Sequence, residues 1–242
     1  MPIGVIANAL CIIIGGIIGA LAGEKLSGDF KDKLNMIFGC CSMSMGISSI
    51  VLMQNMPAVV FSVIIGTVIG LALHLGDRVN AGGRSMQRFI SRFIKNKSDL
   101  SAEEFEASLI TIIVLFCASG TGIYGAMVSG MTGDHSILLT KAILDLFTAL
   151  IFACMLGMVV SLIAVPHFII LSILFLCARF IFPLTTDVMI SDFKACGGFL
   201  MLATGFRMIK VKMFPIADMV PAMVLVMPVS WFWVNYIIPL MS

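Results

Sequence analysis

Runs of about 20 apolar residues recur along almost the whole chain, and they constrain its fold more than any other feature. A helix needs about 20 apolar residues to cross the hydrocarbon core of a bilayer. Of the 242 residues, 60% are hydrophobic and only 12% are charged, whereas an ordinary soluble domain has about 25% charged residues. The mean hydropathy is +1.12. The sequence therefore predicts an all-α polytopic membrane protein, whose first partner is the lipid bilayer.

We predict eight transmembrane helices within a single integral membrane domain covering residues 1–242. They lie near residues 3–23, 34–53, 57–76, 108–129, 137–163, 166–184, 193–209 and 214–240. The boundary between the fifth and sixth helices is the least defined. Val165-Pro166-His167 either forms a tight hairpin or kinks one long helix, because proline removes a backbone donor and disfavours helix at the preceding residue. Seven helices are the alternative.

The basic residues predict the orientation, because cytoplasmic connections of membrane proteins carry an excess of Lys and Arg. If the first helix starts outside, twelve basic residues fall on the inner side and Lys194 alone lies in an outer connection. The twelve are Lys25, Lys31, Lys33, Arg78, Arg84, Arg88, Arg92, Lys95, Lys97, Arg207, Lys210 and Lys212. We therefore expect a multi-pass protein of a bacterial inner (plasma) membrane.

The one extended polar stretch, residues 77–107, is predicted to be a cytoplasmic connector that includes a basic amphipathic helix. Phe89, Ile90, Phe93 and Ile94 fall near one helical side with basic residues around them. Such a helix can lie on an anionic membrane surface. It can equally be a solvated connector, and both interpretations stay open. The stretch is too short for a nucleic-acid-binding module and has no groove-reading signature.

A shift of 159 residues lays the second predicted helix on the seventh, with Gly39 on Gly198 and Gly46 on Gly205. The two helices have opposite directions in the predicted topology. This match suggests an inverted repeat that relates helices 1–3 to helices 6–8, as found in many transporters. Glycine is common in membrane helices, so chance is the alternative.

The fifth predicted helix contains the clearest candidate site. Lys141, Asp145 and Thr148 are spaced by four and three residues, which places them on one helical side. Ionisable groups inside a bilayer are costly and require a partner or a function. The structural interpretation is a Lys–Asp pair that neutralises itself inside the protein. In the functional interpretation, Asp145 accepts a cation or proton and Lys141 contacts an anionic group or tunes the acid.

The fourth predicted helix contains Ser119, Gly120, Thr121 and Gly122, a poor sequence for a straight helix. Close packing through small residues is one interpretation. The other is an interrupted helix, whose free backbone groups line a binding cavity. Thr204 in the seventh helix is a candidate for a second such element.

Other polar residues have simpler interpretations. Asn8 is expected to donate a hydrogen bond between helices, and Asp218 to complement a helix dipole. The histidines are far apart in sequence and the cysteines lie in apolar segments without a Cys-x-x-Cys pair, so we expect no metal site and no cofactor. No P-loop, nucleophile elbow or His-Glu-x-x-His motif occurs. We therefore expect that the protein is not an enzyme.

Three stretches carry a resemblance to a known family. They are FCASGTGIYGAMVSGMTGDHSILLTKAILDLFTALIFACMLG (residues 116–157), PLTTD (183–187) and LATGFRMIKVKMFPIADMVPA (202–222). With the Asn8-Ala9 and Gly15-Gly16 start, they make the chain similar to the YqgA-like family of bacterial inner-membrane proteins over essentially its whole length. The resemblance implies a transport protein without an established substrate, and it carries over no binding or catalytic residue.

The predicted function is that of a secondary transporter for a small polar solute or ion whose identity is unknown, with coupling to a cation left open. An ion channel is the first alternative, and a non-transporting membrane scaffold or sensor is the second. Its glycine-rich helices would also suit a homo-oligomer. A wet central cavity would favour transport, an open path a channel, and a dry, tightly packed interior the scaffold.

Overall fold

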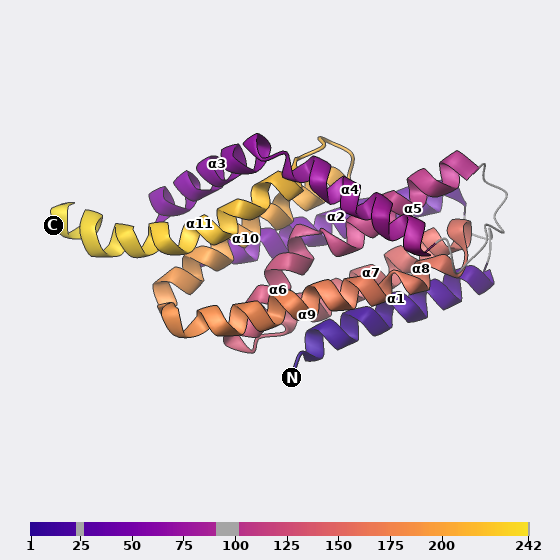
Figure 1. Cartoon of the computed structure of the whole chain (residues 1–242), viewed down its shortest axis with the longest axis horizontal. Helices are drawn as coiled ribbons and strands as arrows, with labels where there is room; N and C mark the ends of the chain where they lie inside the picture. The colour runs from indigo at the N-terminus through magenta and orange to yellow at the C-terminus, as the bar shows by residue number, and fades with distance from the viewer. Residues whose placement is uncertain (23–26, 91–101, 242) are drawn as a thin grey trace. The chain divides into compact units, whose positions relative to one another are not determined.

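The chain folds into helices throughout the part that the computed structural model describes, residues 1–22, 27–90 and 102–241 (Figure 1). Within these ranges there is no strand, and the predicted all-α membrane class is confirmed. The chain divides into two compact units. Unit 1 comprises Met1–Met36 and Arg78–Phe180, and unit 2 comprises Ile37–Asp77 and Ile181–Ser242.

Each unit is a bundle of helices from distant parts of the sequence. Unit 1 contains α1 (Ile3–Ala22), most of α4 (Leu75–Ile90), α5 (Ala102–Cys117), α6 (Gly120–Thr132), α7 (Ser136–Leu156), α8 (Val159–Leu162) and α9 (Ala164–Ile181). Unit 2 contains most of α2 (Gly28–Ile50), α3 (Met56–Ala72), the 3-10 turn η2 (Phe182–Leu184), α10 (Asp187–Met208), α11 (Ile216–Phe232), the π-helical η3 (Trp233–Ile237) and α12 (Ile238–Met241).

The number of helices that can cross a membrane is six by length and composition, among the residues described. It becomes seven if α3 and α4, which meet at a bend of 59°, form one broken span. The predicted number of eight is therefore not confirmed. The difference lies in α2, whose N-terminal half carries several charged residues, and in α3, which is only 17 residues long.

The boundary between the fifth and sixth predicted helices lies earlier than expected. α7 ends at Leu156, Gly157 follows with a φ of 74°, and α9 begins at Ala164. A left-handed φ favours glycine because it has no Cβ. Pro166 lies in the first turn of α9, where the backbone N–H groups have no helical partner for proline to remove. The chain thus forms two helices here, and the end predicted at residue 163 was wrong.

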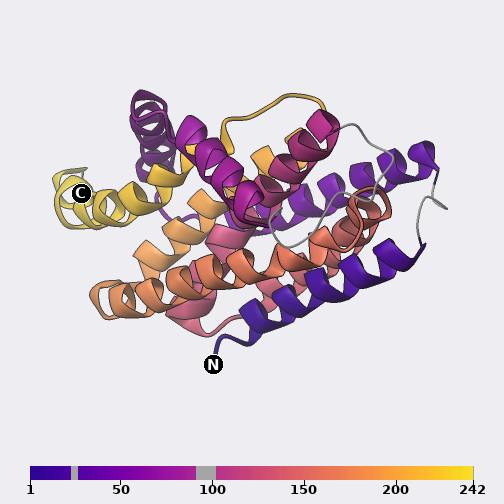
Figure 2. The ribbon, with the colours of Figure 1, turned by 45° about the vertical axis from the view of Figure 1, so that its right-hand side comes forward.

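Glycines bring α1 and α7 together in unit 1, and the two helices lie side by side in Figures 1 and 2. A Cβ on Gly15 would lie 2.2 Å from the carbonyl oxygen of Leu146, and one on Gly19 would lie 2.1 Å from that of Leu150. Only glycine permits such backbone contact. Both pairs are 131 residues apart, so the helices run parallel, in agreement with the predicted topology.

The amphipathic helix α4 packs part of its apolar side inside unit 1. Ile90 is 3% exposed and belongs to the same core cluster as Phe105 and Leu109 of α5, whereas Phe89 is 60% exposed. A Cβ on Gly83 would lie 2.9 Å from the side chain of Val114. Phe93 and Ile94, the other two apolar residues of the predicted connector helix, lie outside the described residues. The described part of α4 is thus neither a wholly solvated connector nor a helix that only rests on a membrane surface.

In unit 2, the glycines that suggested an inverted repeat face each other. A Cβ on Gly46 would lie 2.7 Å from the carbonyl oxygen of Gly198, and one on Gly205 would lie 2.7 Å from that of Gly39. Two antiparallel helices that cross closely need small residues at matching intervals. This contact of α2 with α10 therefore explains the matching glycines without a repeat.

Candidate functional site

A buried ion pair on α7 is the centre of the candidate site. Lys141 and Asp145 are four residues apart, and the Lys141 ammonium donates a hydrogen bond to Oδ2 of Asp145. Their side chains are only 4% and 9% exposed. The structural part of the prediction is confirmed, because the two charges do neutralise each other on one side of the helix.

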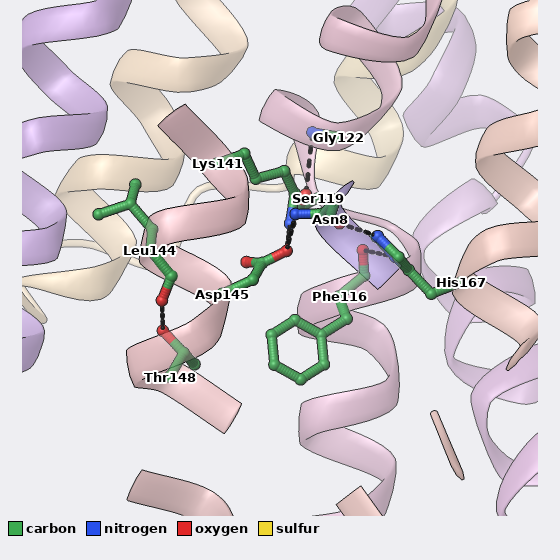
Figure 3. Close-up of polar contacts among 9 residues, drawn as sticks. All are labelled: Asn8, Phe116, Ser119, Gly122, Lys141, Leu144, Asp145, Thr148 and His167. Carbon is green, nitrogen blue, oxygen red and sulfur yellow. Dashed lines mark hydrogen bonds and ion pairs between the residues drawn. The ribbon is translucent and has the colours of Figure 1, made fainter. Parts of the chain in front are cut away.

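Asn8 of α1 joins this pair from a second helix. Its Nδ2 donates to Oδ2 of Asp145 at 2.9 Å, and Asn8 is fully buried. The expected role of Asn8 as a donor between helices is confirmed. The same carboxylate oxygen thus accepts hydrogen bonds from both Lys141 and Asn8, and it links α1 to α7 (Figure 3).

His167 extends the network to α9, and sequence reasoning missed it. The side chain is fully buried. Its Nε2 contacts Oδ1 of Asn8, and its Nδ1 lies 3.1 Å from the carbonyl oxygen of Phe116 (Figure 3). Placing a helix end at Pro166 put His167 near a membrane boundary. The missed signal was an ionisable side chain that starts a long apolar run, since such a group requires a buried partner.

The fourth predicted span is interrupted beside this network. α5 ends at Cys117 and α6 begins at Gly120, with the Ser119 hydroxyl accepting from the backbone N–H of Gly122 at 3.0 Å. The last carbonyls of a helix have no partner further along it, and Phe116 in the last turn of α5 uses its carbonyl for His167. The helix is therefore interrupted at this point, as one of the two interpretations expected, and the binding cavity that this interpretation included stays a prediction.

The interruption lies against the ion pair. A Cβ on Gly122 would lie 3.0 Å from Cε of Lys141, so glycine leaves room for the lysine stem. The Lys141 ammonium lies 5.8 Å from the ring centroid of Phe116, within the range of a cation–π interaction. Thr121 is buried in the first turn of α6. Gly122 thus lies against the lysine end of the network, and Ser119, which accepts from the Gly122 N–H, lies beside it; any binding role of Gly120 and Thr121 stays a prediction.

Two threonines of the predicted site form hydrogen bonds within their own helices. The hydroxyl of Thr148 donates to the carbonyl of Leu144 at 2.8 Å, and that of Thr204 donates to the carbonyl of Leu200 at 2.8 Å. Thr204 belongs to unit 2. Among the described residues, the network around Asp145 includes neither threonine, and any binding role of theirs stays a prediction.

Unit 2 contains a second buried carboxylate that sequence reasoning missed. Asp192 of α10 is fully buried and accepts four hydrogen bonds. Oδ1 accepts from the backbone N–H groups of Gln54 and Asn55, and Oδ2 accepts from Asn55 Nδ2 at 2.9 Å and from the Ser230 hydroxyl at 2.6 Å. These four donors satisfy the carboxylate, which fixes the start of α3 to α10 and α11. We call this group the Asp192 clamp.

The Asn–Asp pairs of the two units share one spacing. Asn8–Asp145 and Asn55–Asp192 are each separated by 137 residues, and a shift of 47 residues carries the first pair onto the second. The same shift lays Gly19 on Gly66 in the sequence. A search at this shift would have found the Asp192 clamp, whereas the glycine-based shift of 159 could not.

The network around Asp145 holds three ionisable side chains, those of Lys141, Asp145 and His167, connected by hydrogen bonds. Lys141 already occupies the carboxylate, and no group of three His, Cys, Asp or Glu suited to a metal ion occurs among the described residues. His167 lies at the other end of the network, and the Asn8 amide connects it to the Asp145 carboxylate. The site thus places two basic side chains and one acid around a polar amide, inside an apolar bundle.

Comparison with known proteins gives matches over nearly the full length. A family described as "Protein of unknown function (DUF554)" matches residues 3–231. The chain is 45% identical over 233 residues to "Uncharacterized protein YqgA" of Escherichia coli (strain K12), with 96% of this chain and 98% of that protein covered. It is 26% identical over 238 residues to "Uncharacterized membrane protein YdfK" of Bacillus subtilis (strain 168), with 96% of each chain covered. No solved structure matches.

Proposed function

The chain belongs to the DUF554 family, and we propose from its own residues that it is a secondary transporter, which moves a small polar solute or ion and is coupled to a cation gradient. One observation carries the proposal: a buried network of Lys141, Asp145, Asn8 and His167 lies where a membrane helix is interrupted. Ionisable groups buried within membrane helices are rare and mark ion and solute pathways.

The interrupted helix supports the proposal independently of the charges. Transporters bind their solutes beside discontinuous helices, because unwound backbone offers free amides and carbonyls inside the bilayer. Here the break at Ser119 separates α5 from α6, next to Lys141. A solute with an acidic group could bind between the N-terminus of α6 and Lys141, if that lysine exchanged its partner Asp145 for the solute.

The proposal includes a location and an orientation. We place the protein in the bacterial inner membrane with the connector 77–107 in the cytoplasm, because twelve basic residues then lie inside and one lies outside. The solute enters and leaves through alternating access, without a chemical reaction on it.

A reconstituted uptake screen tests the proposal. The purified protein in liposomes is supplied with radiolabelled amino acids, carboxylates, sugars and nucleosides, under imposed gradients of protons, sodium or potassium. We expect one solute class to accumulate above protein-free liposomes, only with a gradient, and Asp145→Asn to abolish this accumulation. Asn55→Ala is the matched control, because it weakens the Asp192 clamp in unit 2 and leaves the network around Asp145 intact.

Two outcomes contradict the proposal. One is uptake that no gradient drives for any solute class, and the other is wild-type accumulation by folded Asp145→Asn protein. A scaffold or sensor is the second candidate function, and the backbone-to-backbone glycine contacts of both units favour it. A scaffold shows no uptake at all, whereas a channel conducts its ion down that ion's own gradient without accumulation.

A further inference from the structure

The contact between His167 and Asn8 brings two acceptors together unless the site holds an additional proton. The carbonyl of Phe116 can only accept, so Nδ1 of His167 must carry a hydrogen. In a neutral imidazole the other nitrogen, Nε2, then has none. Nε2 nevertheless contacts Oδ1 of Asn8, which also only accepts.

Moving the ring hydrogen of His167 or turning the Asn8 amide shifts this contact between two acceptors to another place but does not remove it. The second neutral tautomer of His167 gives Nε2 the hydrogen and leaves a bare Nδ1 against the carbonyl of Phe116. Turning the Asn8 amide makes its Nδ2 the donor to His167, but its Oδ1 then faces Oδ2 of Asp145. That arrangement requires a protonated carboxyl. Each satisfied arrangement therefore holds one proton more than a neutral histidine beside an ionised aspartate.

We propose that the Asn8–His167–Asp145 network holds one exchangeable proton, and that this proton is the coupling ion of the transport proposed above. In the loaded state, Nε2–H of His167 donates to Oδ1 of Asn8, and Nδ2–H of Asn8 donates to the Asp145 carboxylate. In the released state the Nε2–H bond is broken, its electron pair stays on the nitrogen, and the proton passes to water.

Release of the proton breaks a contact between helices. Without it, Asn8 can satisfy either His167 on α9 or Asp145 on α7, but not both. Asn8 therefore loses one of its two links to neighbouring helices each time the proton leaves. This couples the proton to the arrangement of α1, α7 and α9, which is the relation that gradient-driven transport requires.

The groups around the histidine act on its second proton in opposite senses. The apolar surroundings and Lys141 on α7 oppose a positive imidazolium, whereas the carbonyl of Phe116, which accepts from Nδ1, favours it. The remaining titratable neighbours are Cys11 of α1 and Cys117 of α5, which are neutral as thiols. Sodium is a poor alternative, because the Lys141 ammonium already occupies the carboxylate and hard cations require several oxygen ligands.

Nitrogen NMR of the histidine ring tests the proton directly, in lipid bilayers without solute or gradient. The variant His74→Gln with His135→Gln leaves His167 as the single histidine. We expect both ring nitrogens to be protonated at low pH, with loss of the Nε2 proton in one step between about pH 4 and pH 7. Hydrogen exchange of α1 and α9 should rise in the same step. Asn55→Ala, in the Asp192 clamp, should leave that step unchanged.

The outcomes separate the proton from the transport function. A ring that keeps a bare Nε2 over this range, with no infrared band of a protonated Asp145 carboxyl, overturns the proton site and leaves transport untouched. A neutral ring together with that carboxyl band supports the site in its turned-amide arrangement. Uptake driven by sodium at equal pH on both sides overturns only the coupling role. A titrating network without any uptake overturns transport and retains the proton site.

Discussion

Replacing Asp145 with asparagine is the most informative single perturbation of this protein. The carboxylate is buried and is the partner of both the Lys141 ammonium and the Asn8 amide. Asparagine keeps the shape but removes the charge, which leaves Lys141 as an unpaired buried cation. Removing one member of a buried ion pair costs about 3–5 kcal/mol. The unfolding equilibrium should therefore shift by roughly two to four powers of ten, at about 1.4 kcal/mol per tenfold change.

The double variant Lys141→Met with Asp145→Leu shows whether the ion pair causes this loss. Replacing both members of a buried pair by apolar residues is often neutral. Here the amide of Asn8 would also lose its acceptor, and an unsatisfied buried donor costs about 1–3 kcal/mol. We therefore expect the double variant to recover only part of the stability, remaining about 1–3 kcal/mol below the wild type.

Reversible unfolding in mixed micelles, followed by circular dichroism, measures both variants. Thr148→Val on the same helix is the matched control. Its hydroxyl donates to the carbonyl of Leu144 within the helix, so a change of about 1 kcal/mol or less is expected. An Asp145→Asn protein within about 1 kcal/mol of the wild type would show that Lys141 does not depend on the carboxylate. A double variant less stable than Asp145→Asn alone would equally refute the reasoning.

Two further predictions concern packing and topology. Gly70→Ala should destabilise the protein by about 1–3 kcal/mol through overpacking, because its Cβ would lie 1.9 Å from the carbonyl oxygen of Asp218. Gly82→Ala is the control: a Cβ there would have nothing within 4 Å, so the same unfolding measurement should show a neutral or stabilising effect. Equal changes in stability for the two variants would refute the close packing at Gly70. In a cysteine-free background, Ser85→Cys and Ser136→Cys, both at exposed positions, should react with impermeant maleimide from opposite sides of inner-membrane vesicles. Labelling of both from one side would show that the predicted topology is wrong.

The labelling positions illustrate what the structure adds to a topology derived from charge. Residue 90 lies in the predicted polar connector, so the sequence suggests that a cysteine placed there would react with maleimide. In the structure, however, Ile90 is buried against α5. Ser85, on the same helix, is exposed. Periodicity shows which residues share a side of a helix, but it does not show which side another helix covers.

The sequence by itself determined the membrane class, the approximate position of most helices and the Lys141–Asp145 pair. These features depend on local properties: the length of apolar runs and the spacing of residues along one helix. The same applies to the weak helix at Ser119, because serine and glycine destabilise a helix wherever it packs.

Only the tertiary structure decided which distant residues complete the site. Asn8 and Asp145 are 137 residues apart and meet because glycines bring α1 against α7, and His167 joins Asn8 from α9, 159 residues away. Asp192 likewise meets Asn55 and Ser230 only after three helices have packed. A single polar residue in an apolar run shows that it needs a partner. The partner's identity depends on which helix faces it, and this is fixed by packing between segments that local sequence does not relate.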